Sequence, residues 1–178
     1  DPVTPGAWVD YWALSQSVLP NFNLLKVRVF TSVLATADPT LAQTRWLQQQ
    51  EMQPKLSIHL GRIKKTTRID PLTASNEVST DSGTVKVLKY EEKGSDVALA
   101  AHLVRDAFTE SASIHYVMTS DTDFEPVIAM LKNQLKVRVG ILCTTKNFPK
   151  LFSSLNPDDI RHVKASQVGK SMLKSLGP

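Results

Sequence analysis

Three aspartates stand where a predicted strand passes into a predicted helix. Asp96 follows the segment YEEKGS and precedes an apolar pattern with helical spacing, while Asp121 and Asp123 follow the apolar run SIHYVM. A single aspartate at a helix N-terminus is usually a cap, because its carboxylate accepts backbone N–H bonds and stabilises the helix by about 0.5–2 kcal/mol. A helix start has one cap position, so two aspartates in one turn indicate an additional role. The Asp-x-Asp spacing is only moderately specific, since phosphatases and glycosyltransferases use it too.

Carboxylates that converge from separate turns repel one another, and without a cation one of them must take up a proton. Mg²⁺ or Mn²⁺ removes this conflict, because hard cations prefer oxygen ligands, and such an ion polarises a phosphate and lowers the pKa of a water nucleophile. The same turns offer supporting groups. Thr119 and Ser120 carry hydroxyls for a carboxylate or phosphate oxygen, and Lys93 can meet the scissile phosphate or pair with Asp96. The pattern therefore favours phosphodiester chemistry.

A basic strip precedes the first acidic motif. The segment GRIKKTTR contains Arg62, Lys64, Lys65 and Arg68, and the whole chain has a net charge of +4 and a pI of about 9.2. Such a strip can hold the phosphates of RNA, because phosphate contacts dominate affinity without giving sequence specificity. The alternative is a solvated strand edge that lysines protect from pairing, and charge alone favours that alternative.

Strands and helices alternate through most of the chain, which predicts an α/β fold with a largely parallel sheet. Functional residues of such sheets gather beyond the carboxyl ends of the strands, and both acidic motifs fall at such positions. We predict strands at residues 24–34, 55–63, 84–90, 113–118, 136–142 and 160–164, and helices at residues 8–19, 38–50, 95–108, 124–131, 148–155 and 167–176. Residues 70–83 are polar and predict a loop.

Apolar spacing also predicts which helix faces are buried. In the helix after Gly94, the i, i+3, i+4, i+7, i+11 pattern selects Val97, Ala100, Ala101, Val104 and Phe108. In the helix after the second acidic motif, helical spacing selects Phe124, Val127, Ile128 and Leu131.

Several classes of protein are disfavoured by composition. Cys143 is the only cysteine, which excludes an intrachain disulfide and a cysteine-rich zinc site. No apolar run is long enough to cross a bilayer and no secretory signal is visible, so we expect a cytoplasmic protein without a membrane partner. The four histidines have no metal-binding spacing, and the chain lacks a G-x-S-x-G motif and a P-loop.

The segments EEKGSDVALAAHLVRDAF, SIHYVMTSDTDFEPVIAML and KVRVGIL, in this order, resemble the NYN domains of the LabA-like branch of the PIN-like nuclease superfamily. The resemblance extends over nearly the whole chain. It implies a single domain over residues 1–178, with a three-layer α/β/α PIN-like (Rossmann-like) fold and a largely parallel central sheet. Thr119 stands where the family usually has serine, and Lys93 matches the family's lysine.

The resemblance implies a metal-dependent endoribonuclease, a hydrolase in which Asp96, Asp121 and Asp123 bind Mg²⁺ or Mn²⁺ and RNA, single-stranded rather than duplex, is the partner. The family's first strand carries Asp-Gly-x-Asn, whose aspartate is a principal metal ligand. We expect the natural chain to have this central strand upstream of Asp1. The alternatives are a catalytically inactive RNA-binding or regulatory module and an unrelated Asp-x-Asp enzyme such as a phosphatase. A homo-oligomer is left open.

Overall fold

The computed structural model describes residues 8–33, 42–71, 84–109, 111–144 and 150–173. In chain order the elements are α1 (Tyr11–Val18), β1 (Val27–Thr31), α2 (Ala42–Glu51), β2 (Leu56–Leu60), β3 (Arg62–Pro71), β4 (Thr84–Lys93), α3 (Ser95–Thr109), β5 (His115–Met118), η1 (Thr122–Phe124), α4 (Glu125–Ala129), η2 (Met130–Gln134), β6 (Val139–Cys143), α5 (Lys150–Ser154), β7 (Asp159–His162) and α6 (Ala165–Lys170).

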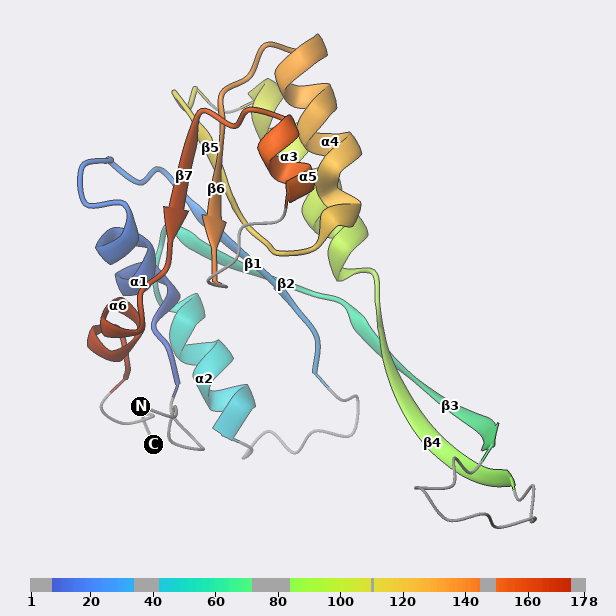
Figure 1. Cartoon of the computed structure of the whole chain (residues 1–178). Helices are drawn as coiled ribbons and strands as arrows, with labels where there is room; N and C mark the ends of the chain where they lie inside the picture. Colours follow the sequence, from blue (N-terminus) through green and yellow to red (C-terminus); the bar gives the residue numbers. More distant parts are fainter. Residues whose placement is uncertain (1–7, 34–41, 72–83, 110, 145–149, 174–178) are drawn as a thin grey trace.

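β6 is the central strand of a three-stranded parallel sheet with the order β5-β6-β7. Its side chains alternate between two cores, as strand geometry requires. Val139 and Ile141 pack with residues of α3, α4 and α5, whereas Leu142 packs with residues of α1. Helices therefore cover both faces of this sheet, with α3, α4 and α5 on one side and α1 and α6 on the other (Figure 1). The predicted α/β class is confirmed.

A second parallel pair, β1 and β2, lies beside this sheet, and α2 connects its two strands (Figure 1). β1 pairs with β2 along one edge, and β5 pairs with β6 along one edge. Among the described residues, no strand pairs with the other edge of β1 or with the other edge of β5. The parallel strands thus form two groups.

β3 and β4 form a long antiparallel hairpin that projects from the body of the molecule (Figure 1). We call these two strands the arm. Their register runs from the Arg62–Lys93 pair at the base to the Pro71–Thr84 pair. The sequence prediction was wrong about the length of the arm: it had a strand over residues 55–63 and a loop from residue 70. Residues 72–83, the rest of the predicted loop, lie outside the described residues.

Gly61 separates β2 from β3 because the chain passes tightly against the start of α3 there. A Cβ atom at this position would lie 2.5 Å from the Ser95 Oγ and 3.0 Å from the Lys93 carbonyl oxygen. The Gly61 N–H donates to the Thr31 carbonyl at 2.8 Å. The end of β1, the base of the arm and the first turn of α3 therefore meet at one point.

The predicted buried face of α3 was partly wrong. Val97 and Phe108 have exposed fractions of 74% and 69%, and Ala101 is also exposed. The helix instead packs Leu99, Ala100, Leu103, Val104 and Ala107 against the core. Apolar residues surround most of α3, so helical spacing fits two faces equally well, and contact with α4 and β6 selects between them.

The prediction for the helix after the second acidic motif is confirmed. Phe124, Ile128 and Leu131 are almost completely buried, and Val127 packs against the same cluster. Pro126 is accommodated in the first turn of α4, where its missing N–H has no helical partner to lose. None of the helices in the described parts of the chain is long and apolar enough to cross a membrane.

Candidate functional site

Asp121 and Asp123 occupy the turn that joins β5 to α4. Asp121 has extended backbone geometry and is the N-cap of η1: its Oδ1 accepts the N–H of Asp123 at 2.9 Å. The Asp121 N–H in turn donates to the Thr119 Oγ1 at 3.1 Å. Both aspartates are exposed, as is Ser120. Asp121 therefore performs the capping role, and Asp123 is the additional carboxylate that the sequence predicted.

Asp96 lies in the first turn of α3, at the other strand-to-helix turn. Gly94 has a positive φ of 97°, which lets the chain turn sharply between β4 and α3. Ser95 is buried and donates through its Oγ to the Thr31 carbonyl at 3.4 Å. Asp96 itself is exposed. The first turn of α3, and with it Asp96, is thus held against the carboxyl end of β1.

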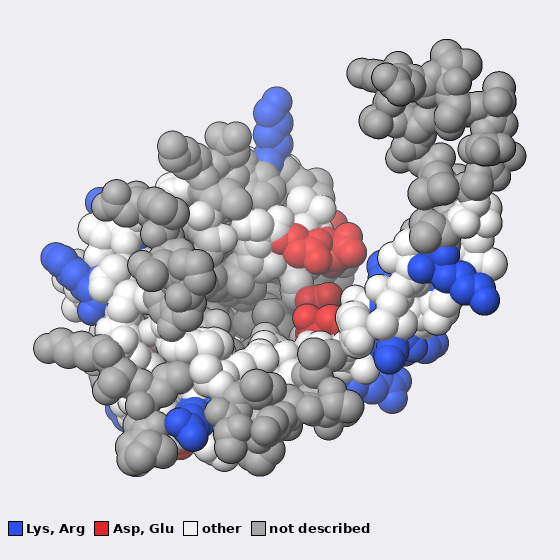
Figure 2. Space-filling view, turned by 90° about the horizontal axis from the view of Figure 1, so that it is seen from below, with Lys and Arg blue, Asp and Glu red and all other residues white. Residues whose placement is uncertain are grey.

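Both turns lie on the side of the molecule toward which β6 and β7 point in Figure 1. Figure 2 views the molecule from that side: acidic side chains form two adjoining red patches near its centre, and basic side chains gather along the arm beside them. Within the described ranges, no Lys or Arg forms an ion pair with Asp96, Asp121 or Asp123. Lys93, which the sequence could pair with Asp96, bonds instead to Glu91 at 3.1 Å.

Exposed carboxylates without a basic partner suit Mg²⁺ or Mn²⁺, because these ions prefer oxygen ligands and keep several waters. No group of three His, Cys, Asp or Glu in the described residues is, however, arranged around one point in a way that would hold a metal ion. The donor chemistry fits such an ion, but the described residues alone do not form a metal site.

The arm separates the basic strip into two faces, because directly opposed residues of an antiparallel pair lie on the same side. Arg62, Lys64 and Arg68 share one face with Lys89 and Lys93. Lys65 lies on the opposite face. Glu91 is on the first face and bridges Lys89 and Lys93 at 3.0 and 3.1 Å, and these side-chain bonds lower the pKa of Glu91 to about 2. Sequence reasoning missed Lys89 and Lys93 as members of the basic face because it could not know the pairing.

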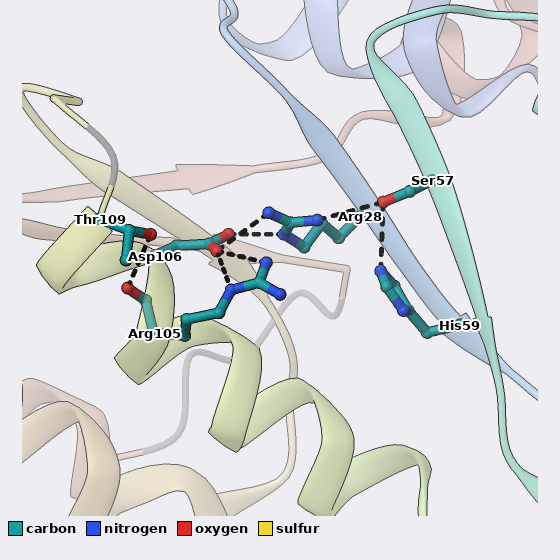
Figure 3. Close-up of polar contacts among 6 residues, drawn as sticks. All are labelled: Arg28, Ser57, His59, Arg105, Asp106 and Thr109. Atoms are coloured by element: carbon teal, nitrogen blue, oxygen red, sulfur yellow. Dashed lines mark hydrogen bonds and ion pairs between the residues drawn. The ribbon is translucent and has the colours of Figure 1, made fainter.

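A polar network fastens α3 to β1 (Figure 3). The Arg28 guanidinium donates to both carboxylate oxygens of Asp106, at 2.5 and 2.9 Å, and through Nη1 to the Ser57 Oγ at 3.3 Å. Arg105 donates to the same carboxylate at 2.7 Å, and its carbonyl accepts the Thr109 hydroxyl at 3.0 Å. Burial alone would raise the pKa of Asp106, but the bonds and charges of both arginines outweigh it and lower this pKa.

An imidazole pair continues the same interface. The rings of His59 on β2 and His102 on α3 lie with centroids 4.1 Å apart, and Phe30 contacts both rings. The His59 Nε2 is 3.1 Å from the Ser57 Oγ. Burial lowers the pKa of both histidines, and the nearby positive charges of Arg28 and Arg105 lower it further. These histidines pack the α3 interface, in keeping with their lack of metal-binding spacing.

Two proteins and one family are similar to this chain. A crystal structure of a protein of unknown function from Vibrio parahaemolyticus superposes with a TM-score of 0.53 over 96% of this chain and 85% of that one, at 10% identity, which shows the fold alone. The 6-hydroxy-3-succinoylpyridine 3-monooxygenase of Pseudomonas putida is 26% identical over 94% of this chain. The chain spans only 56% of that relative's length. The NYN domain matches residues 22–158, more than half of the chain, and the chain therefore belongs to the NYN domain family, a PIN-like nuclease family.

Proposed function

We propose that this protein is a divalent-metal-dependent endoribonuclease that hydrolyses phosphodiester bonds in RNA. The observation that carries the proposal is the position of Asp96, Asp121 and Asp123. In a chain of a nuclease family, these three exposed carboxylates lie at two strand-to-helix turns and have no basic partner in the described residues. Helix capping does not require three carboxylates at these two turns, since one cap residue satisfies each helix N-terminus.

In this proposal Asp96, Asp121 and Asp123 hold Mg²⁺ or Mn²⁺. The bound ion supplies neutralisation of the phosphate charge and a water of lowered pKa. Thr119 keeps the Asp121 turn in place through the bond from the Asp121 N–H to its hydroxyl. Ser120 is exposed beside it and can donate to a phosphate oxygen. Lys93, at the base of the arm, is the member of the basic face that lies next to the acidic turn of α3 in the chain.

We further propose that another strand completes both the sheet and the acidic set. Two observations support this. In the described residues, the second edges of β1 and β5 have no partner strand, and the N–H and C=O groups of a strand edge need hydrogen-bond partners wherever water does not reach them. Within the described ranges, no three His, Cys, Asp or Glu residues are grouped around one point, so a further carboxylate would help Asp96, Asp121 and Asp123 to hold the ion. An additional strand along one of these open edges, with an aspartate at its carboxyl end, would pair with that edge and add a carboxylate to the acidic set.

RNA is the proposed substrate because the family is associated with RNA and because a basic face adjoins the acidic turns (Figure 2). Arg62, Lys64 and Arg68 belong to that face. Their contacts are expected to be with phosphates, which orient the strand without reading its sequence. Lys65 lies on the other face of the arm.

Cleavage of a labelled single-stranded RNA in the presence of Mn²⁺ tests the proposal. We expect internal cuts that EDTA abolishes and that Asp121→Asn reduces by at least about a hundredfold, because removal of one metal ligand is costly whereas asparagine still caps η1. Glu51→Gln is the matched control: Glu51 is an exposed carboxylate at the end of α2 that leads into β2, away from the carboxyl ends of the strands. RNA binding without any cleavage at millimolar Mn²⁺ would identify an inactive RNA-binding module instead.

A monooxygenase is the second candidate, on the ground that the similarity to the 6-hydroxy-3-succinoylpyridine 3-monooxygenase extends over 94% of this chain. Because the chain spans 56% of that relative, residues that the relative needs for its activity can lie outside the shared part. Oxygen uptake with a hydroxylated pyridine and an added two-electron donor distinguishes the candidates. Uptake that persists in Asp121→Asn, together with intact RNA, would favour the oxygenase.

A further inference from the structure

The arm exposes two faces of different chemistry, and only one of them belongs to the basic strip. The face with Arg62, Lys64 and Arg68 suits phosphates. The opposite face includes the cross-strand pairs Ile63–Glu92, Lys65–Tyr90, Thr67–Leu88 and Ile69–Lys86. This second face, which we call the aromatic face, combines apolar side chains with two lysines, one threonine and one glutamate.

Its apolar side chains are strongly exposed. Ile69, Tyr90 and Leu88 have exposed fractions of 61%, 51% and 47%. They lie on a hairpin that projects away from both cores, so packing within the body does not explain them (Figure 1). Contiguous apolar groups on the surface of a folded protein usually mark a contact surface.

The positive charge of the arm favours an anion as the occupant of this surface. The two strands of the arm contain seven Lys and Arg and three Asp and Glu, so seven minus three gives a net charge of +4, as large as that of the whole chain. On the aromatic face, Lys65 lies directly opposite Tyr90, and Lys86 lies opposite Ile69. Lys65 and Lys86 outnumber Glu92, the acidic residue of this face, and an aromatic ring with a lysine directly opposite it is suited to an anionic ligand that also has flat rings.

We propose that the aromatic face binds unpaired bases of single-stranded RNA, with Tyr90 as the stacking residue and Lys65 and Lys86 as phosphate contacts. This inference rests on the proposed function and names its substrate class. Bases of a single strand can stack on an aromatic side chain, whereas those of a duplex are stacked on one another and cannot. The arm thus selects single strands, while the basic face binds the backbone of either form.

Fluorescence anisotropy tests this in EDTA, where no metal-dependent cleavage occurs, with a labelled oligouridylate and a blunt RNA duplex of the same length. We expect Tyr90→Ala to weaken binding of the oligouridylate by about tenfold, the range found for loss of one stacked base, and to leave duplex binding unchanged. Tyr90→Phe should retain the affinity. Phe108→Ala, which removes another exposed aromatic ring at the far end of α3, should change neither.

The outcomes separate this inference from the proposed function. If the wild type binds both RNAs and Tyr90→Ala binds them equally well, the inference is wrong while the proposed function stands. If the wild type binds no RNA, both are wrong. If Tyr90→Ala instead converts a dimer to a monomer in sedimentation and leaves RNA affinity unchanged, the aromatic face binds a second copy of the chain, which also overturns the inference. Equal melting temperatures of the wild type and Tyr90→Ala verify that the body of the molecule remains folded in the variant.

Discussion

The two aspartates of the Asp-x-Asp turn have different roles even though they are two residues apart. Asp121 accepts a backbone N–H and caps η1. Asp123 is exposed and donates only its backbone N–H to that bond. Capping and metal binding favour the same residue type at the same place, so the sequence could locate both aspartates but could not say which one is the cap. Only the bond from the Asp123 N–H assigns the role.

This difference predicts how alanine substitutions separate stability from activity. Asp121→Ala should lower the free energy of unfolding by about 1 kcal/mol, because the cap bond is lost. Asp123→Ala should change it by less than about 0.5 kcal/mol, as for most surface sites. Both should abolish Mn²⁺-dependent RNA cleavage if both carboxylates bind the ion. Urea denaturation and the cleavage assay measure the two effects. A fully active Asp123→Ala variant would remove Asp123 from the site.

Gly61 is a second residue whose role is visible only in three dimensions. We expect Gly61→Ala to lower the melting temperature and RNA cleavage together, because its Cβ would lie 2.5 Å from the Ser95 Oγ and displace the turn that carries Asp96. The clash predicts partial rescue in the double variant Gly61→Ala/Ser95→Ala, which removes the Oγ. The contact at 3.0 Å with the Lys93 carbonyl remains, so rescue should be incomplete. An additive double-mutant cycle, which indicates that two residues do not interact, would contradict this explanation.

At the scale of elements, the sequence predicted the strands that surround the acidic turns because these strands consist largely of apolar residues. The burial of all five residues of β6 matches the continuous apolar run expected of a central parallel strand. The arm was not predicted at its full length, because alternation of apolar and basic residues does not reveal which segment pairs with which. The predicted buried face of α3 was partly wrong for a related reason. Helical spacing does not reveal which other elements pack against a helix.

The interface between β2 and α3 predicts a dependence of stability on pH. The folded-state pKa values of His59 and His102 lie below 6.5, because both rings are partly buried and face Arg28 and Arg105. The unfolded chain therefore binds protons below about pH 6.5 that the folded chain does not, and the free energy of unfolding falls as the pH drops through this range. Asp106, whose carboxylate faces this pair, has a pKa lowered from its ordinary value of 3.8 and stays charged throughout this range.

Chemical denaturation between pH 7.5 and pH 5 measures this dependence, with these values chosen to lie on either side of the histidine pKa of about 6.5. The double variant His59→Gln/His102→Gln should flatten the curve, because it removes both histidines whose pKa is lowered in the folded state. A wild-type protein that gains stability on acidification would show that the imidazole pair does not govern this range.

At the scale of the whole molecule, acidic and basic groups are divided between two places. The two strands of the arm carry a net charge equal to that of the chain, and the acidic patches lie beside the arm on the same side (Figure 2). The separation suits a substrate that is held along the arm while one phosphate reaches the acidic turns. Sequence composition gave the total charge, but its concentration on the arm depends on the pairing of β3 with β4.

This distribution predicts that RNA binding depends on salt mainly through the basic face of the arm. Each phosphate contact releases about one counterion, so log Kd should rise with log salt concentration, and Lys64→Ala should reduce the slope by roughly 0.7 for single-stranded RNA. Lys170→Ala, which removes an exposed lysine from the end of α6, should leave the slope unchanged. Because phosphates are common to all sequences, the loss in Lys64→Ala should be equal for single strands and duplexes, in contrast to the loss in Tyr90→Ala. If Lys64→Ala and Lys170→Ala reduced the salt slope equally, RNA would bind along the body of the molecule and not along the arm.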